Sequence, residues 1–356
     1  MGVALPHLMK DLSITATAAQ WLTTAFMLTM AVVIPITGFL IQRFHTRPVF
    51  ITAMTLFSTG TLIAALAPGF EVLLLGRIVQ ASGTAIMMPL LMTTVTTLVA
   101  PASRGKTMGN ISIVISVAPA IGPTISGIIL SILDWRWMFI LVLPIAIGAL
   151  LLGASRIKNV TTPRQVPLDL LSVVLSAFGF GGFVYGLSNL GGTAAAGWVP
   201  LGIGLVALAL FVLRQLHLQR NNRALLDLRV FTSRIFTLSI SMLMITHIGM
   251  SAGLSLLFTP LFTSGLGSLK PNLYSHGSAV VGTVQQLAGA AGTALFIAVM
   301  TSQSAALTAQ GVNEVSATAS GIRGAFLCGT TVSLLAIPAA FFVRRPPLGE
   351  PVAIGH

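Results

Sequence analysis

The chain has 356 residues, of which 55% are hydrophobic and only 7% are charged, and its mean hydropathy is +0.95. Soluble domains carry about 25% charged residues, so this composition excludes an ordinary water-soluble globular protein. The formal net charge of +12 would also suit a nucleic-acid-binding protein. However, the cations are spread over separate loops instead of one patch, so we expect no nucleic-acid partner.

Apolar runs follow one another along the chain, and each approaches the length of about 20 residues that crosses a bilayer core. They lie near residues 20–42, 48–68, 72–99, 107–133, 137–154, 169–190, 198–213, 235–268, 276–302 and 321–343. We therefore predict an all-α, multi-pass membrane protein. The apolar sequence from Ile235 to Leu269 would be about 52 Å long as one helix. It crosses the bilayer either once or, with a bend near His247, twice.

The basic residues fall mainly in every second loop between these runs. Loops rich in Lys and Arg stay on the cytoplasmic side of a membrane protein. The predicted cytoplasmic cations are Arg43, Arg47, Arg104, Lys106, Arg156, Lys158, Arg164, Arg214, Arg220, Arg223, Arg229, Arg234, Lys270, Arg344 and Arg345. The other loops hold only Lys10, Arg136 and Arg323. The excess positive charge therefore indicates topology.

Charged side chains inside the runs are scarce, which makes Arg77 informative. An arginine within a span is costly unless it faces a cavity, a partner or polar backbone. Arg77 either snorkels to the nearby interface or faces a cavity, with Gln80 near it at a spacing of three residues. We expect the carboxylate of Asp169 to cap the helix that follows it. The carboxylates at or beyond predicted span ends are Asp11, Glu71, Asp134, Asp169 and Glu314.

The sequence contains no convincing catalytic or metal-binding pattern. His247 and His276 fall in predicted membrane regions, where we interpret a lone histidine as a polar interface residue in preference to a proton relay. No HExxH, zinc-type Cys/His spacing or GxSxG elbow occurs, and Cys328 is the single cysteine. We therefore predict no catalytic residue, no metal and no cofactor, and an intramembrane enzyme is the weaker alternative.

Several uncharged side chains could line a wet cavity in a helix bundle. Their alternative role is hydrogen bonding between helices, which contributes about 0.6 to 2 kcal/mol per bond. The candidates for a substrate cavity are Trp21, Phe26, Asn110, Gln285 and Gln286, with Tyr185 as a further lining residue. The sequence alone does not separate the two roles.

Three stretches form recognisable motifs: "GFLIQRFHTR" (38–47), the residues from Arg77 to Ala85, and "APAIGPTISG" (118–127). Together they resemble the major facilitator superfamily, and more narrowly its fourteen-helix branch of drug:proton antiporters of the lincomycin-resistance type. In the first motif, the family pattern is GxLxDRxGRR. Gly38, Arg43 and Arg47 match, whereas Gln42 replaces an aspartate. The resemblance implies a charge network that closes the cytoplasmic side, and Gln42 lacks the charge to join it.

The third motif is similar to the family's helix-5 antiporter pattern, gxxxGPxxGG. Gly122, Pro123 and Gly127 match this pattern, and Ala118 and Ser126 occupy small positions. Glycines let a neighbouring helix approach closely, and proline bends a membrane helix whose freed carbonyl finds other partners. We expect a tight seam between the two halves of the protein at this helix.

The resemblance covers nearly the whole chain and implies a facilitator-type fold of two bundles with two extra linker helices. We assign residues 1–155 to the N-terminal bundle, 156–234 to the extra helices with their cytoplasmic linkers, and 235–356 to the C-terminal bundle. The implied function is proton-coupled export of small amphipathic compounds across a bacterial cytoplasmic membrane by alternating access. Arg77 and Gln80 would lie beside the proton pathway. The alternatives are an exporter of one metabolite or lipid, and a non-transporting membrane remnant or scaffold.

The same resemblance predicts two gaps relative to the family. "VALP" (3–6) matches the end of a helix-1 pattern, LDxTIVNVALP, whose acidic residue would precede Met1. Near Ile245 and Thr246 the sequence passes from a match to helix 9 to a match to helix 12, without helices 10 and 11. We therefore expect a chain that inserts into the membrane but does not couple proton flow to export.

Overall fold

Every regular element in the described part of the chain is helical. The computed structural model describes residues 4–159, 163, 167–189, 194–221, 223–248, 261 and 263–334. Its α-helices are α1 (Leu5–Asp11), α2 (Ala16–Arg43), α3 (Thr46–Ala65), α4 (Phe70–Leu98), α5 (Pro101–Ile132), α6 (Trp137–Ile140), α7 (Val142–Arg156), α8 (Leu170–Ser188), α9 (Ala194–Leu218), α10 (Arg234–Ile248), α12 (Tyr274–Ala309) and α13 (Glu314–Leu334). The predicted all-α class is confirmed.

Seven of the helical stretches in these ranges are long and apolar enough to cross a membrane. They are α2, α3, α4, α6 together with α7, α8, α9 with its extension to Asn221, and α12 with the turn before it. The apolar parts of α5 and α10 are shorter. Helix α5 nevertheless continues without a break past Pro119 and Pro123. The predicted multi-pass character therefore holds for most of the expected spans.

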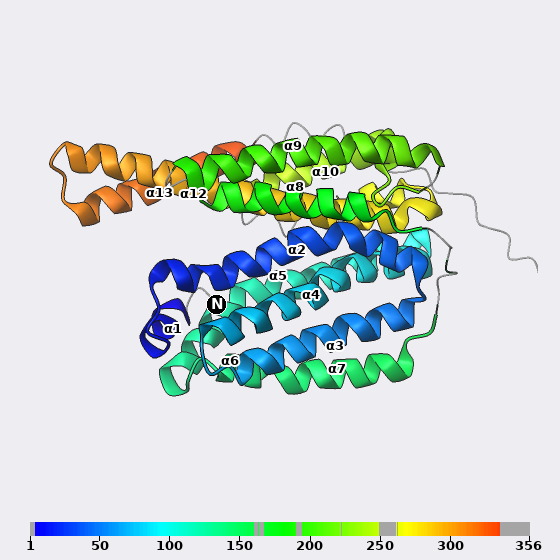
Figure 1. Cartoon of the computed structure of the whole chain (residues 1–356), viewed down its shortest axis with the longest axis horizontal. Helices are drawn as coiled ribbons and strands as arrows, with labels where there is room; N and C mark the ends of the chain where they lie inside the picture. The colour runs from blue at the N-terminus through cyan, green and yellow to red at the C-terminus, as the bar shows by residue number, and fades with distance from the viewer. Residues whose placement is uncertain are drawn as a thin grey trace, which may run out of the picture.

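The helices form two groups, which Figure 1 shows one above the other. Helices α1–α7 make up the lower group, here called the N-terminal group. Helices α8, α9, α10, α12 and α13 make up the upper one, here called the C-terminal group. Helix α2 lies at the boundary and contacts both α8 and α12. The predicted extra helices α8 and α9 thus lie on the same side of the boundary as the C-terminal helices.

One end of the molecule collects the loops that carry the predicted cytoplasmic cations. The turn between α2 and α3, the end of α7, the linker after α9 and the start of α12 all lie at the right-hand end of Figure 1. We call this the basic end. At the opposite end, near α1 and α6, Arg136 pairs with Asp11 (3.2 Å), and Trp135 Nε1 donates to the same carboxylate (2.7 Å).

The long apolar run after Arg234 turns back on itself. The hydroxyls of Ser233 and Ser268 lie 2.7 Å apart, and a Cβ on Gly265 would lie 3.2 Å from the Cβ of Ser239. A single straight helix would separate Ser233 from Ser268 by about 50 Å, so the chain returns to the basic end. Helix α10 passes through Thr246 and His247 unbroken to Ile248, and residues 249–260 lie outside the described ranges.

Two helix starts show how the sequence sets the element boundaries. Thr15 Oγ1 accepts the Ala18 N–H at the start of α2 (3.2 Å), and Asp169 Oδ2 accepts the Ser172 N–H at the start of α8 (3.1 Å). Both are N-caps of the residue types that satisfy free backbone donors. The predicted cap at Asp169 is confirmed, and the same carboxylate also receives two hydrogen bonds from Arg214 (2.6 and 2.7 Å).

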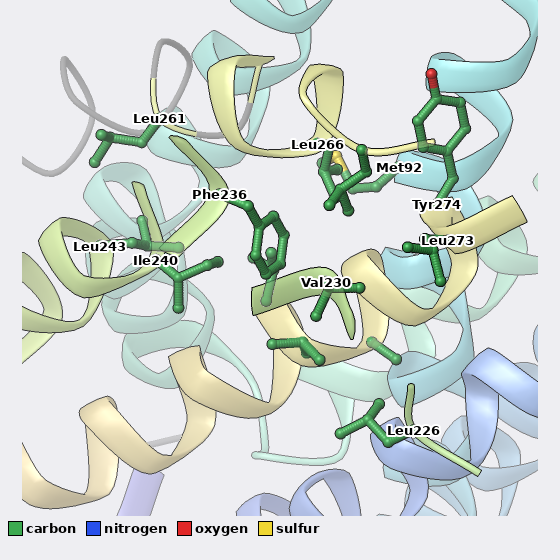
Figure 2. Packing of buried hydrophobic residues seen from close by; sticks show 14 of the residues in the cluster. Met92, Leu226, Val230, Phe236, Ile240, Leu243, Leu261, Leu266, Leu273 and Tyr274 are labelled. Carbon is green, nitrogen blue, oxygen red and sulfur yellow. The ribbon is translucent and has the colours of Figure 1, made fainter. Parts of the chain in front are cut away.

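A buried apolar cluster joins the two groups near the basic end. It contains Met92 of α4 and residues of α8, α9, α10 and α12. Figure 2 shows Met92 together with Phe236, Leu266, Leu273 and Tyr274. Burial of this surface holds the two groups against each other, and the polar contacts described below lie beside it.

Candidate functional site

Arg77 belongs to a small polar cluster inside the N-terminal group. Its Nη1 donates to Gln80 Oε1 (2.5 Å), and Gln80 Nε2 donates to Thr61 Oγ1 of α3 (2.9 Å). The guanidinium also stacks on the ring of Phe26 in α2, 4.1 Å from its centroid. We call these four residues the arginine cluster. Arg77 contacts α2 through Phe26 and reaches α3 through Gln80, which favours the inward-facing interpretation over snorkelling, and Gln80 is its neighbour as the spacing suggested.

Very close packing of α3 against α4 holds the arginine cluster in place. A Cβ on Gly76 would lie 2.8 Å from the backbone N of Ala64, and one on Gly83 would overlap the carbonyl of Ala53. On the other side, a Cβ on Gly60 would overlap the backbone of Gln80 itself. Small residues allow such an approach between membrane helices. Gln80 therefore has little freedom to move relative to α3.

One donor of the arginine cluster lacks a partner. Arg77 Nε is buried without a hydrogen bond in the described part of the chain, and no carboxylate described there forms an ion pair with Arg77. The described carboxylates all lie at helix ends or in loops: Asp11, Glu71, Asp134, Asp169, Asp227 and Glu314. The cluster therefore presents a cation and a free N–H that a water or a ligand acceptor can satisfy.

A second polar cluster lies between the two groups at the basic end. Gln42 Nε2 donates to Ser275 Oγ (2.8 Å) and lies 2.6 Å from His276 Nε2. The second ring nitrogen, Nδ1, faces the Asp227 N–H (3.3 Å), and because a neutral imidazole accepts at one nitrogen only, the tautomer decides which of these two contacts is a hydrogen bond. We call these four residues the Gln42 latch. It joins α2 to α12 and to the linker before α10, which are far apart in sequence.

Further contacts extend the closure around the Gln42 latch. Thr93 Oγ1 donates to Ser278 Oγ (3.1 Å), and the guanidinium of Arg104 lies 5.7 Å from the ring centroid of Tyr274. Asp227 pairs with Arg229 (2.6 Å). Burial acts to raise the pKa of Asp227, but hydrogen bonds from Arg229 and the nearby positive charge outweigh it, so that pKa lies below its usual value. The carboxylate is therefore ionised at neutral pH.

The predicted gating loop takes part in this closure in a different way from the family pattern. The charge network that the resemblance implies is replaced here by neutral hydrogen bonds, and Gln42 itself forms them. Gly38 marks a close approach of α2 to α12, because a Cβ there would lie 3.3 Å from the Cβ of Ala279. Arg43 is half-buried, and the exposed Arg47 donates its backbone N–H to Asn159 Oδ1 (3.2 Å).

The antiporter motif on α5 does not form the expected seam within the described residues. A Cβ added to Gly122 or Gly127 would have no heavy atom of the described chain within 4 Å. Pro123 is exposed and Ser126 is half-buried, while the side chain of Ala118 lies outside the described part of the molecule. Since a seam needs a neighbour in contact with these glycines, the sealing role of α5 stays a prediction from the resemblance.

Three candidates for a substrate cavity, on α2 and α5, are not brought together by the contacts of the structure. Trp21 packs against Tyr185 of α8 with ring centroids 5.5 Å apart. Phe26 is taken up by Arg77, whose guanidinium covers its ring. Asn110 is exposed on α5. These three candidates therefore stay separate within the described structure.

The two glutamine candidates lie next to each other on α12. Gln285 and Gln286 are half-buried and form no hydrogen bond with described residues. They follow a close approach of α12 to α2, because a Cβ on Gly282 would lie 3.1 Å from Cγ2 of Ile34. Their amides thus lie near the boundary between the two groups, and a role in substrate contact stays a prediction.

Sequence reasoning missed most of the Gln42 latch. His276 was expected to be a polar interface residue, and its position agrees with that. Asp227, by contrast, is not among the predicted site residues, although a carboxylate two residues before Arg229 in the most charged stretch of the chain is an available signal. The partners Ser275, Ser278 and Thr93 have no distinctive pattern, because hydroxyls are common in membrane helices.

Comparisons with known proteins agree with this arrangement. A family model described as Major Facilitator Superfamily matches residues 1–293. The uncharacterized MFS-type transporter YcnB of Bacillus subtilis is 33% identical over 96% of this chain and 90% of its own length. The lincomycin resistance protein LmrB of Listeria monocytogenes is 33% identical over 97% of this chain and 93% of its own length.

The alignment with YcnB is much longer than the part of this chain that it covers. It runs over 435 positions, whereas 96% of 356 residues is about 342, so about 93 positions have no counterpart in this chain. The excess shows that YcnB has segments without a counterpart in this chain, and the absence of helices 10 and 11 stays a prediction. Among solved structures, the MFS proton:xylose symporter XylE has the same fold, with a TM-score of 0.52 at 15% identity over 96% of this chain and 91% of that chain. The chain belongs to the Major Facilitator Superfamily.

Proposed function

We propose that this protein exports small amphipathic, largely apolar compounds across a bacterial cytoplasmic membrane by alternating access. The observation that carries the proposal is the Gln42 latch, a set of contacts between the N-terminal and C-terminal groups at one end of the molecule. The name of LmrB, a lincomycin resistance protein, supports a drug-like substrate. The polar and aromatic residues near the boundary, Trp21, Gln285 and Gln286, remain the candidates for substrate contact.

The chemistry of the latch suits a contact that must open and close. A neutral hydrogen bond contributes only about 0.5 to 1.5 kcal/mol net, because water replaces the lost partner when the contact opens. A hydrogen bond to a charged group contributes more, about 1.5 to 3 kcal/mol. Replacing the family's aspartate by Gln42 therefore leaves a closure that is easier for transport to break.

The arginine cluster suits a different task. Its cation is held rigidly by Gln80 and Phe26, and its free Nε can hold an acceptor from water or from a substrate. In the proposal, Arg77 keeps a fixed positive charge beside the path between the groups. No mid-span carboxylate occurs in the described part of the chain, so we expect export to depend only weakly on a proton gradient.

Efflux of a preloaded fluorescent dye from cells that express residues 1–356 tests the proposal. The expected result is faster dye loss than in cells with an empty vector, with little change when an uncoupler is added. Dye loss that the uncoupler abolishes would show proton coupling through groups other than those described. No dye loss, together with normal abundance in the membrane, would support the non-transporting alternative.

A further inference from the structure

A pocket of about 490 Å³ opens at the basic end between α3, α4 and the segment that follows α7. Its volume falls in the range of small-ligand pockets, roughly 300 to 1,000 Å³. Most of its wall is apolar, and two cations lie at its mouth. The lining residues are Thr46, Phe50, Met87, Leu90, Leu91, Thr94, Leu98, Arg156, Ile157 and Lys158.

The pocket lies where a membrane-spanning surface meets the polar region. Thr46 begins α3, Leu98 ends α4 and Arg156 ends α7. Leu91 and Leu98 are exposed on the outer surface of α4, Leu98 by 58%. Because the helices that carry these residues are spans, an exposed leucine next to the pocket faces the hydrocarbon edge of the bilayer. Acyl chains therefore have direct access.

The two cations at the mouth are available for a ligand. Arg156 and Lys158 are exposed, and neither forms an ion pair or hydrogen bond within the described ranges. No carboxylate lines the pocket among the described residues. The segment that carries Lys158 is attached to α3, since the Arg47 N–H donates to Asn159 Oδ1 (3.2 Å). Both charges are thereby kept beside the apolar wall.

An apolar pocket with a cationic mouth matches an amphiphile that has an anionic head and a hydrocarbon tail. Basic pockets between membrane helices on the cytoplasmic side are suited to anionic lipid head groups. A soluble anion would leave the leucine and phenylalanine wall unfilled, and an apolar drug would leave the cations unused. The position at the predicted cytoplasmic surface places the pocket among the lipids of the inner leaflet.

We propose that this pocket binds one anionic phospholipid of the cytoplasmic leaflet. Arg156 and Lys158 hold its phosphate, and an acyl chain lies along Phe50, Leu90 and the rest of the apolar wall. The bound lipid links the end of α7 to α3 and α4. This inference requires membrane insertion but not export, so it stands or falls independently of the proposed function.

Thermal unfolding of the full chain, purified in a non-ionic detergent and titrated with lipid, tests the proposal. Phosphatidylglycerol should raise the melting temperature of the wild type more than phosphatidylcholine does. In R156Q/K158Q the apparent affinity for phosphatidylglycerol should fall about 25-fold, since each of the two cations contributes about a fivefold factor. The matched control R220Q/R223Q removes two cations of the linker after α9 and should keep the wild-type response.

Two further measurements separate the head group from the tail. Thr94→Trp fills the apolar part of the pocket without removing charge, and it should abolish the response to phosphatidylglycerol. Soluble glycerol 3-phosphate should produce no shift, and a full shift with it would overturn the proposal in favour of a plain phosphate site. Equal shifts with both phospholipids, or a wild-type response in R156Q/K158Q, would also overturn it.

Discussion

The arginine cluster and the Gln42 latch are both polar contacts among apolar helices, but they differ in what they join. Arg77, Gln80, Thr61 and Phe26 all lie in the N-terminal group. The Gln42 latch crosses from α2 to α12 and the linker before α10. The first contains a charge and rests on tightly packed backbones, and the second is formed by neutral hydrogen bonds. The fixed contact carries the charge, whereas at the latch the contacts of Gln42 across the boundary are neutral and the charged pair of Asp227 with Arg229 lies within the linker before α10.

The largest expected effect comes from the packing that fixes the arginine cluster. Gly83→Leu places a branched side chain against the backbone of Ala53, where overpacking costs about 1 to 3 kcal/mol or more. We expect nearly complete loss of folded protein, measured as monodisperse material in detergent. Gly122→Leu on α5 is the control, because open space surrounds that glycine among the described residues, and its folded yield should stay near wild type. Equal losses would remove the distinction.

The next effect concerns the planar guanidinium group of Arg77. Arg77→Lys keeps the charge but loses the planar group that stacks on Phe26 and contacts Gln80. A hydrogen bond to a charged group contributes about 1.5 to 3 kcal/mol, so efflux should fall about tenfold or more at unchanged membrane abundance. Arg323→Lys, on the exposed surface of α13, is the matched control and should transport normally. Normal efflux by the Arg77 variant would favour a purely structural arginine.

A smaller effect is expected for the Gln42 latch. In a double-mutant cycle of Gln42→Ala and His276→Ala, the coupling free energy should be about 1 kcal/mol, as for a neutral hydrogen bond. Thermal unfolding in detergent measures it. The pair Thr84→Ala and Thr301→Ala, whose hydroxyls bond only within their own helices, should give no coupling. A value of several kcal/mol would mean that the latch is too strong to open readily.

The last effect is expected for an ion pair inside the C-terminal group, between Asp169 and Arg214. Hydrogen bonds from Arg214 lower the pKa of Asp169 to about 2. A lowered carboxylate pKa adds stability that is present above the unfolded-state value near 4 and is lost as the pH falls towards 2. After allowance for solvent screening, the loss should be about 1 kcal/mol. Melting curves of wild type and Asp169→Asn between pH 5 and pH 2 should converge at the acid end.

The sequence was sufficient for most of the fold, because membrane spans are read from length and apolarity alone. It also paired Arg77 with Gln80, since residues three apart share a helix face. It could not place Gln42 against His276, because that contact depends on how α2 and α12 meet across more than 200 residues of chain. Likewise, nothing local distinguishes Gly83, which is tightly packed, from Gly122, which is not.

A disulfide across the boundary tests the central claim that the two groups separate at the basic end during transport. In a Cys328→Ser background, Gly38→Cys and Ala279→Cys place sulfurs on Cβ positions about 3.3 Å apart, close to the spacing that a disulfide requires. Dye efflux is then measured after oxidation and again after reduction, with each single-cysteine variant as a control. The account predicts that the oxidised protein loses efflux and that reduction restores it. Equal efflux by the oxidised and reduced protein would contradict it.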